Sequence, residues 1–203
     1  MTIKAPADLN ETARSSSARE IHAVFTVVNS TAVTLHNIDI DGGKLMANGT
    51  MVFDGSKESG GTLRVFDGAA DDVLTGGGGD DVLFGNLGGD TLRGGAGADT
   101  FRYQFAADST SALRDGIQDF ALGDRIDLST IDANVLIEGN QAFSFVGNAA
   151  FSKTAGELRF DNISSGGPIW MVQGDTDGNG VSDFELVLVT SDADPITTTD
   201  FHL

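Results

Sequence analysis

The sequence contains no cysteine, which excludes disulfide bonds, thiolate metal sites and a cysteine nucleophile. Proline is scarce, with 3 residues among 203, and 12 Lys and Arg stand against 30 Asp and Glu, giving a formal net charge of −18. A chain of this charge lacks the cationic surface that nucleic acids and anionic membranes attract, so we expect neither as a partner. The charge instead favours partners that neutralise carboxylates, above all hard divalent cations.

Long apolar runs are also missing. Nothing approaches the length of a membrane span, and residues 1–20 lack the apolar core of a signal peptide. We therefore expect no membrane insertion, and either a cytosolic location or export without an N-terminal signal peptide. Histidine occurs only at His22, His36 and His202, so an H-E-x-x-H zinc-protease motif is absent, as is a G-x-S-x-G nucleophile elbow. These absences predict that the chain is not an enzyme.

Glycine, by contrast, is abundant and partly periodic. Residues 67–102 divide into four consecutive nonapeptides, DGAADDVLT, GGGGDDVLF, GNLGGDTLR and GGAGADTFR. Their sixth residues are Asp72, Asp81, Asp90 and Asp99, and their eighth residues are Leu74, Leu83, Leu92 and Phe101. A flexible linker has no reason to keep Asp and a large apolar residue in register, and the aspartates would repel a nucleotide phosphate.

This periodicity predicts a calcium-stacked β-roll. Glycines allow tight turns and leave carbonyl oxygens free, while the residue at position eight points inward from a short strand. Two nonapeptides form one coil, so residues eighteen apart stack, and stacked carboxylates need a cation such as Ca²⁺ between them. The predicted ligands come from the turns, as side chains or backbone carbonyls: Asp72, Gly76, Gly77, Gly78, Gly79, Asp81, Gly85, Leu87, Gly88, Asp90, Gly94, Gly95, Ala96, Gly97 and Asp99.

Such a roll should depend on its metal. One buried apolar side chain per nonapeptide returns less free energy than ordering nine backbone residues costs, and sheet hydrogen bonds narrow this deficit without closing it. We therefore expect the roll to be largely disordered without calcium and to fold when the ion binds.

Further acidic residues extend the possible sites. Asp108 lies eighteen residues after Asp90 and could supply a ligand in the last coil, with Asp115 close enough to help; a polar surface turn is the alternative. Downstream, DTDGNGVSD (175–183) has oxygen-bearing residues at the spacing of a calcium loop, although Leu186 stands where such a loop needs Glu. We prefer a polar hairpin turn and keep a weaker calcium site as the alternative, with the ligands Asp175, Asp177, Asn179 and Asp183.

Strand patterns flank the repeats and suggest four regions. Residues 1–22 are polar and expected to be disordered, and 23–66 are β-rich, either an N-terminal cap or degenerate solenoid coils without calcium ligands. A module that binds a sugar polymer or cell surface is a sharper alternative for 23–66, but no aromatic cluster supports it. Residues 67–108 form the roll, and 109–203 are expected to form an antiparallel β cap with its own core, including Phe120, Leu128, Phe143, Trp170 and Leu186.

Several motifs together resemble a known family. They are GGAGADTFRY, DGIQDFALGDRIDLS, GELRF, GDTDGNGVSDFELVL and the terminal DFHL, and the nonapeptides follow the pattern G-G-x-G-x-D-x-U-x of RTX calcium-binding proteins. Over roughly residues 67–203 the chain resembles the C-terminal domain of serralysin-type secreted metalloproteases. The resemblance implies an all-β fold, with a right-handed parallel β-roll that binds several Ca²⁺ ions and a C-terminal antiparallel β-sandwich-like cap.

The resemblance also implies a route of export. The family uses type I secretion, in which an ABC transporter complex reads an uncleaved C-terminal signal that commonly ends in an acidic residue followed by hydrophobic ones. Asp200, Phe201 and Leu203 fit this signal, although His202 interrupts the apolar run. The chain departs from the family in having no zinc-protease motif, and in Asp67, Ala70 and Asn86, which replace glycines of the nonapeptides.

The function predicted from these observations is a non-enzymatic calcium-binding protein or module, secreted by the type I route, whose roll folds on binding extracellular Ca²⁺. One alternative is an accessory or targeting module of a secreted enzyme, of the metalloprotease, polysaccharide epimerase or lyase, or lipase type. Another is a secreted effector or adhesion protein that uses the roll as a carrier.

Overall fold

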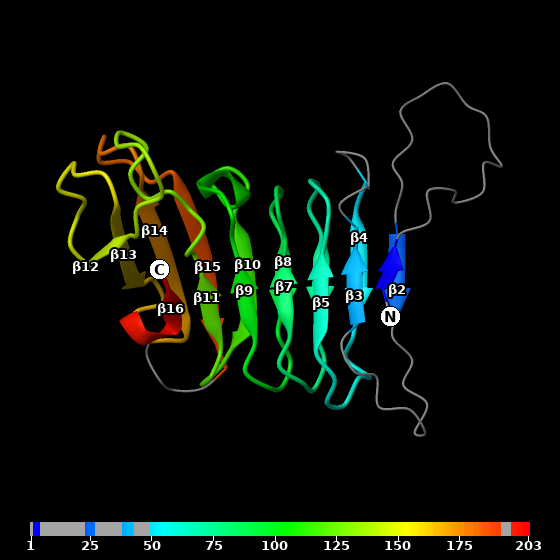
Figure 1. The fold of residues 1–203 in the computed structure, drawn as a ribbon. Helices are drawn as coiled ribbons and strands as arrows, with labels where there is room; N and C mark the ends of the chain where they lie inside the picture. The colour runs from blue at the N-terminus through cyan, green and yellow to red at the C-terminus, as the bar shows by residue number, and fades with distance from the viewer. Residues whose placement is uncertain (1, 5–22, 27–37, 43–48, 192–195) are drawn as a thin grey trace.

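The computed structural model describes residues 2–4, 23–26, 38–42, 49–191 and 196–203 (Figure 1). Strands of the N-terminal half are β1 (Thr2–Lys4), β2 (Ala23–Thr26), β3 (Ile38–Asp41), β4 (Met51–Asp54), β5 (Leu63–Phe66), β6 (Val73–Thr75), β7 (Val82–Phe84), β8 (Thr91–Arg93) and β9 (Thr100–Arg102). The C-terminal half contains β10 (Asp115–Phe120), β11 (Arg125–Asp127), β12 (Ser144–Gly147), β13 (Glu157–Asn162), β14 (Ile169–Asp175), β15 (Phe184–Thr190) and β16 (Phe201–His202).

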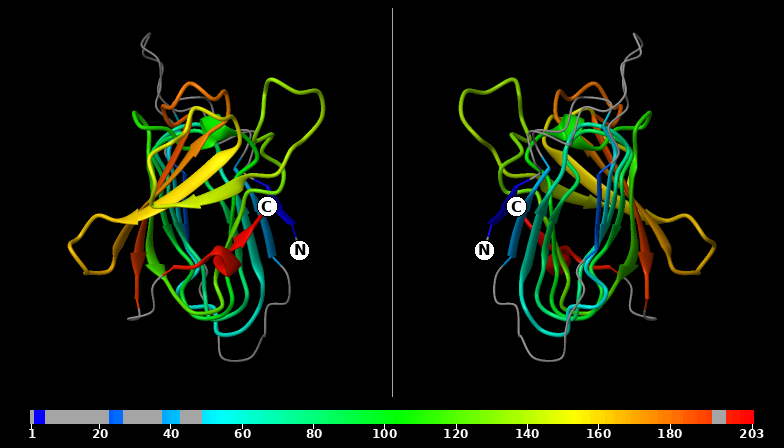
Figure 2. Two further views of the ribbon diagram at one scale, coloured as in Figure 1. Left: turned by 90° about the vertical axis from the view of Figure 1, so that its left-hand side faces the viewer. Right: turned by 90° about the vertical axis from the view of Figure 1, so that its right-hand side faces the viewer.

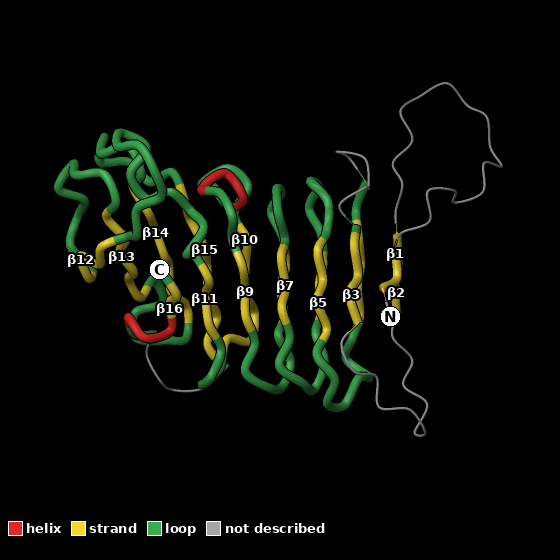
Figure 3. The backbone as a smooth tube through the Cα atoms, in the orientation of Figure 1, coloured by secondary structure: helices red, strands yellow, loops and turns green. Residues whose placement is uncertain are grey.

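Helix is confined, in this part of the chain, to two short 3₁₀ turns, η1 (Ala106–Asp108) and η2 (Thr198–Asp200) (Figure 3). None of the described helices is long and apolar enough to cross a membrane. The protein is therefore all-β, as predicted.

Successive strands of the repeat region alternate between two sheets. The first sheet has the order β1-β3-β5-β7-β9-β11-β16, and the second has the order β12-β13-β14-β15-β10-β8-β6-β4-β2. From β1 to β11 the neighbouring strands of each sheet are parallel. Viewed from either end, the two sheets face each other and turns join them at both edges (Figure 2). This is the parallel arrangement that a nonapeptide repeat predicts.

The core is built from the eighth residue of each nonapeptide. Leu74 and Leu92 are aligned neighbours in the second sheet, Leu83 and Phe101 are aligned in the first, and none is more than 1% exposed. The column of the second sheet continues upstream to Phe53 and downstream to Ile117, and that of the first to Val65 and Ile126. The inward orientation predicted for position eight is confirmed.

The N-terminal strands continue the same coils. β4 pairs with β6 and β5 with β7, so that Met51 aligns with Asp72 and Leu63 with Asp81. Both residues are fully buried, and they place apolar side chains where the later coils carry aspartate. β4 and β5 thus continue the parallel pairing of the coils upstream, with apolar residues in place of the aspartate of the repeat.

Residues 5–22, most of the segment expected to be disordered, lie outside the described residues. Within that segment Thr2–Lys4 instead form β1, paired in parallel with β3. The edge of β3 offers unpaired backbone N–H and C=O groups, which a further strand can satisfy.

The C-terminal strands extend the second sheet. β10 pairs in parallel with both β8 and β15, while β14 is antiparallel to β13 and β15. The apolar residues expected to form a separate core here belong to, or pack against, one buried cluster that extends from Ile40 to Phe201. The structure therefore has one continuous core, because the paired strands leave no break between the roll and the C-terminal strands.

Candidate metal centre

The turns that join the sheets lie along two edges of the roll. We call the first edge the turns 67–72, 85–90 and 103–114, which lead from the first sheet to the second. We call the second edge the turns 55–62, 76–81, 94–99 and 121–124, which lead back. Each nonapeptide aspartate ends its turn directly before a strand, so the aspartates gather at the two edges.

These aspartates stack as the spacing predicts. The N–H of Asp72 donates to Oδ1 of Asp90 over 2.8 Å on the first edge, and the N–H of Asp81 donates to Oδ1 of Asp99 over 2.8 Å on the second. One oxygen of each downstream carboxylate is therefore used to hold the coil before it.

The stacked aspartates, which we call the ladder, continue for one more coil. The spacing along the sequence is longer there. The N–H of Asp90 donates to Oδ1 of Asp115, and the N–H of Asp99 donates to Oδ1 of Asp124, twenty-five residues on in both cases. The eighteen-residue register expected to reach Asp108 is therefore wrong at this coil. The extra residues lie in the turn 103–114, which includes η1, and they shift the stacking position to Asp115.

Asp108 nevertheless faces the same edge. Its side chain is fully buried, its Oδ2 accepts hydrogen bonds from the N–H groups of Gln104 and Phe105, and its Oδ1 has no partner. Its charge acts on Asp115 and on Tyr103, whose buried hydroxyl also lacks a hydrogen-bond partner. The structure thus brings Asp108 and Asp115 together, as expected, but through an inserted turn.

The second carboxylate oxygen, Oδ2, of the ladder aspartates indicates what the site can bind. Oδ2 is buried and lacks a hydrogen-bond partner in Asp72, Asp90, Asp99 and Asp115. Buried polar atoms are normally paired, and a buried anionic oxygen without a donor needs either a proton or a cation. These residues therefore fit a hard cation, which binds oxygen ligands.

The pKa values of the ladder carboxyls agree with this interpretation. Burial, assisted by neighbouring carboxylates, raises the pKa of Asp81 to about 6, Asp99 to about 7, Asp115 to about 8 and Asp90 to about 9. Burial also raises the pKa of Asp72. Without a metal, several of these groups hold protons near neutral pH; a bound cation would reverse this preference by stabilising the ionised forms.

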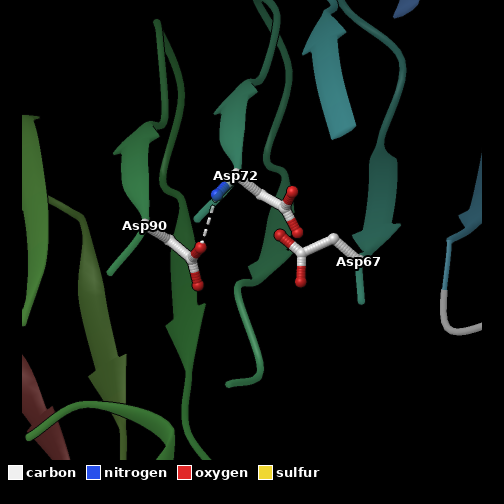
Figure 4. Close-up of side chains that lie close together, drawn as sticks. All are labelled: Asp67, Asp72 and Asp90. Atoms are coloured by element: carbon white, nitrogen blue, oxygen red, sulfur yellow. Dashed lines mark hydrogen bonds between the residues drawn. The ribbon is translucent and has the colours of Figure 1, made fainter. Parts of the chain in front are cut away.

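The first edge contains a three-carboxylate cluster. One oxygen each of Asp67, Asp72 and Asp90 lie within 4.8 Å of one another, and all three side chains are buried (Figure 4). Asp67 was not among the predicted ligands, because it replaces a glycine of the repeat. The available signal was its carboxylate at the start of a nonapeptide, five residues before Asp72.

The glycines of the turns allow the coils to lie close together. A Cβ on Gly76, Gly85 or Gly94, the first residue of its nonapeptide, would collide with Oδ2 of that nonapeptide's own aspartate. A Cβ on Gly88, Gly95 or Gly97, which all have positive φ, would collide with a carbonyl oxygen of the preceding coil. Asn86 takes the place of glycine at φ 57°, a left-handed conformation that Asn tolerates.

The remaining predicted positions could act only through their backbone. The side chains of Leu87 and Ala96 are exposed, and Gly77, Gly78 and Gly79 have no side chain to offer. Their carbonyl oxygens stay predicted ligands.

The turn 175–183 presents a different kind of acidic cluster. One oxygen each of Asp175, Asp177 and Asp183 lie within 4.8 Å of one another, but the turn itself supplies their donors. Asp175 accepts from the N–H groups of Gly178 and Gly180, and Asp183 accepts from the N–H of Thr176. Asp177 and Asn179 accept from N–H groups two residues on. These contacts describe a polar hairpin between β14 and β15, in which no buried carboxylate oxygen lacks a hydrogen-bond partner.

Residues 60–202 match the family described as Peptidase M10 serralysin C terminal. The chain belongs to this family. No curated protein matches the chain. The match covers the C-terminal domain of the peptidase family and no protease domain. Calcium binding, a β-roll and secretion fit this family, and the acidic clusters are compatible with a metal.

The terminal residues of this serralysin C-terminal domain are part of the fold. Phe201 is 8% exposed in the core, and β16 pairs in parallel with β11. Nδ1 of His202 lies 3.2 Å from Oδ1 of Asp127. His202, which interrupts the apolar run of the expected signal, thus contacts the neighbouring strand.

Proposed function

We propose that this serralysin C-terminal domain is a non-enzymatic calcium-binding module of an exported protein, and that its roll folds when it binds extracellular Ca²⁺. The observation that carries the proposal is the set of buried carboxylate oxygens without a hydrogen-bond partner, repeated from coil to coil along the first edge of the roll and present at Asp99 on the second. A non-enzymatic role is supported by a family match confined to the C-terminal domain.

Calcium suits this set of ligands better than other common metals. The chain has no cysteine, and the ladder offers only carboxylates and backbone carbonyls, which are the hard ligands that Ca²⁺ takes in flexible geometry. The proposed ligands are the aspartates of the ladder together with turn carbonyls: Asp72, Asp81, Asp90, Asp99, Asp108, Asp115 and the carbonyls of residues 76–79, 85, 87, 88 and 94–97.

The metal requirement would match a route of export. Extracellular calcium modules bind with dissociation constants of about 10⁻⁴–10⁻³ M, far above the calcium concentration of a cytosol. The chain would stay unfolded inside the cell, pass through a type I exporter, and fold outside as the ion shifts the equilibrium by mass action. We propose that Asp200, Phe201 and Leu203 belong to the signal that the exporter reads.

Finer features of the architecture belong to the same proposal. We propose that the coil is right-handed, as parallel crossover connections almost always are, and that the antiparallel strands β13–β15 cover the end of the roll. The four regions 1–22, 23–66, 67–108 and 109–203 then differ in role, since the first sheet contains strands from all four regions and the second sheet contains strands from the last three.

Far-UV circular dichroism and small-angle scattering in chelator and in millimolar calcium test the proposal, with magnesium at equal ionic strength as control. We expect strand content and compactness to appear cooperatively with calcium and not with magnesium, which demands stricter octahedral geometry. Equal strand content in chelator and in calcium would refute calcium-coupled folding. Turnover of protein, polysaccharide or ester substrates would refute the non-enzymatic role.

A further inference from the structure

The first nonapeptide differs from the other three at its first residue. In the others that residue is Gly76, Gly85 or Gly94, and a Cβ there would meet the carboxylate of the same nonapeptide. In the first nonapeptide a real side chain, that of Asp67, starts from this position, directly after β5. The position that the repeat keeps empty therefore carries a carboxylate that is directed at Asp72.

The group that lies against Asp67 is another carboxyl, that of Asp72, and the two can share a hydrogen bond only when one of them is protonated. The Asp67 side chain is 1% exposed, and no N–H group donates to either of its oxygens. Figure 4 shows its carboxylate facing that of Asp72, with Asp90 on the neighbouring coil. Oδ2 of both Asp72 and Asp90 also lacks an N–H donor. One oxygen from each of the three buried carboxylates thus lies within 4.8 Å of the others on the first edge.

We infer that Asp67 is a calcium ligand that the repeat does not itself supply, and that it makes the Asp67–Asp72–Asp90 cluster the tightest Ca²⁺ site of the chain. This inference rests on the proposed function, because it concerns one site of the calcium-binding roll. It is specific to the first edge, where the turns 67–72 and 85–90 lie on adjacent coils.

Charge and rigidity both support the ranking. Calcium affinity rises with the number of charged ligands and with the rigidity of the site. On the second edge, the turns 76–81 and 94–99 provide Asp81 and Asp99, and both oxygens of Asp81 already accept hydrogen bonds. Among the described residues of the roll, only the Asp67 cluster brings oxygens of three carboxylates within 4.8 Å of one another, so it should load first.

Position in the chain gives this site a role in folding. Upstream, Met51 and Leu63 occupy the positions that aspartates occupy in the ladder. Asp67 therefore lies at the boundary between coils with an apolar residue at this position and coils with an aspartate there. An ion held here would link β5, which ends one residue before Asp67, to the turn of the next coil. We expect this ion to start the ordering of the roll.

Isothermal titration calorimetry of the full chain with CaCl₂ tests the inference with three variants. Asp67→Asn removes the charge at constant size, and Asp67→Gly restores the glycine of the repeat. Asp71→Asn is the matched control, because it removes one charge from the same turn while its exposed side chain lies outside the cluster. Circular dichroism at saturating calcium follows folding.

We expect the tightest class of sites to weaken at least tenfold in Asp67→Asn and Asp67→Gly, and to change less than threefold in Asp71→Asn. Terbium(III), which carries more charge, should lose more affinity than Ca²⁺ in Asp67→Asn. The inference is overturned if Asp67→Gly binds calcium in the same tightest class as the wild type, whether or not Asp67→Asn folds. If the wild-type chain binds no calcium at all, the proposed function fails, which is a separate outcome.

Discussion

The acidic cluster on the first edge of the roll and the acidic turn 175–183 are both rich in aspartate. They differ in the hydrogen-bond donors that surround their carboxylates. In the turn, Asp175 and Asp183 accept hydrogen bonds from nearby backbone N–H groups. In the roll, each ladder aspartate on the first edge gives one oxygen to the preceding coil and leaves the other buried without a donor. Both clusters bring three carboxylates within 4.8 Å.

The difference shows that acidic composition does not itself indicate a metal. A short turn can fold back so that its own amides satisfy its carboxylates, as aspartates and asparagines do in Asx-turns. In the ladder, the N–H groups of Asp72, Asp81, Asp90 and Asp99 are committed to the neighbouring coil, and in Asp81 an amide of its own turn, that of Gly77, satisfies the second oxygen. We therefore expect the two clusters to respond differently to pH, to calcium and to mutation.

The largest effect should come from pH, since it acts on several ladder carboxyls at once. Their pKa values rise from 3.8 in the unfolded chain to about 6, 7, 8 and 9 for Asp81, Asp99, Asp115 and Asp90. Between these limits the metal-free folded state binds more protons than the unfolded chain, so its stability is fully present below about pH 4 and falls as pH rises toward 9.

Far-UV circular dichroism of resin-decalcified protein at pH 5 and pH 8 checks this expectation, because the strand content that remains without metal reports the stability of the metal-free fold. We expect greater metal-free stability at pH 5, and in calcium the opposite trend, because protons compete with the ion for the same oxygens. Greater metal-free stability at pH 8 would contradict the account of the ladder.

Removal of Asp90 should have the next largest effect, because this residue belongs to the three-carboxylate cluster and stacks on Asp115. We expect Asp90→Asn to shift the calcium midpoint of folding at least tenfold. Losing one site costs about 2.7 kcal/mol where free calcium exceeds its dissociation constant a hundredfold. Calcium titrations followed by circular dichroism measure the shift. An unchanged midpoint would place the ion elsewhere.

Close stacking of the turns can be tested at two glycines. Gly95 has φ +96° and faces Gly77 O of the preceding coil, whereas a Cβ on Gly60 would meet nothing within 4 Å. We expect Gly95→Ala to destabilise the calcium-loaded protein by about 1–3 kcal/mol through strain, and Gly60→Ala to have little effect. Thermal unfolding in saturating calcium compares them. Equal melting temperatures would mean that the coils can separate at this turn.

The smallest effects on calcium binding should come from the turn 175–183. Asp175→Asn leaves the N–H of Gly180 facing an amide, and we expect a loss of about 1–3 kcal/mol, with less than about 0.5 kcal/mol for Asp177→Asn nearer the surface. Calorimetry should count the same number of calcium ions in both variants as in the wild type. One ion fewer in Asp175→Asn would make this turn a calcium site.

The strict nonapeptides made much of this architecture predictable. Asp at position six and Leu or Phe at position eight repeat without a slip, so stacking of Asp72 on Asp90 and burial of Leu83 follow from counting along a parallel coil. The repeat also predicted where glycine is needed, because the adjacent coil lies so close.

Two features of the candidate site could not be predicted from the spacing of the repeat. The coil after Phe101 is seven residues longer, so the stacking position moved from Asp108 to Asp115 once the inserted turn had folded outside the ladder. Asp67 looked like a defect of the repeat. Its direction toward Asp72 became visible only with the backbone of the turn in place.

By itself, the sequence determined the period of the roll, the identity of its inward residues and the preference for a hard cation, because these follow from local repetition and charge. The tertiary structure alone decided which carboxylate oxygens are left without a donor. That depends on which amides the neighbouring coil and the inserted turn bring within hydrogen-bond distance. Asp175 and Asp90 are the same residue type in similarly acidic stretches. Amides of its own turn donate to Asp175, whereas Oδ2 of Asp90 has no donor and belongs to a candidate metal site.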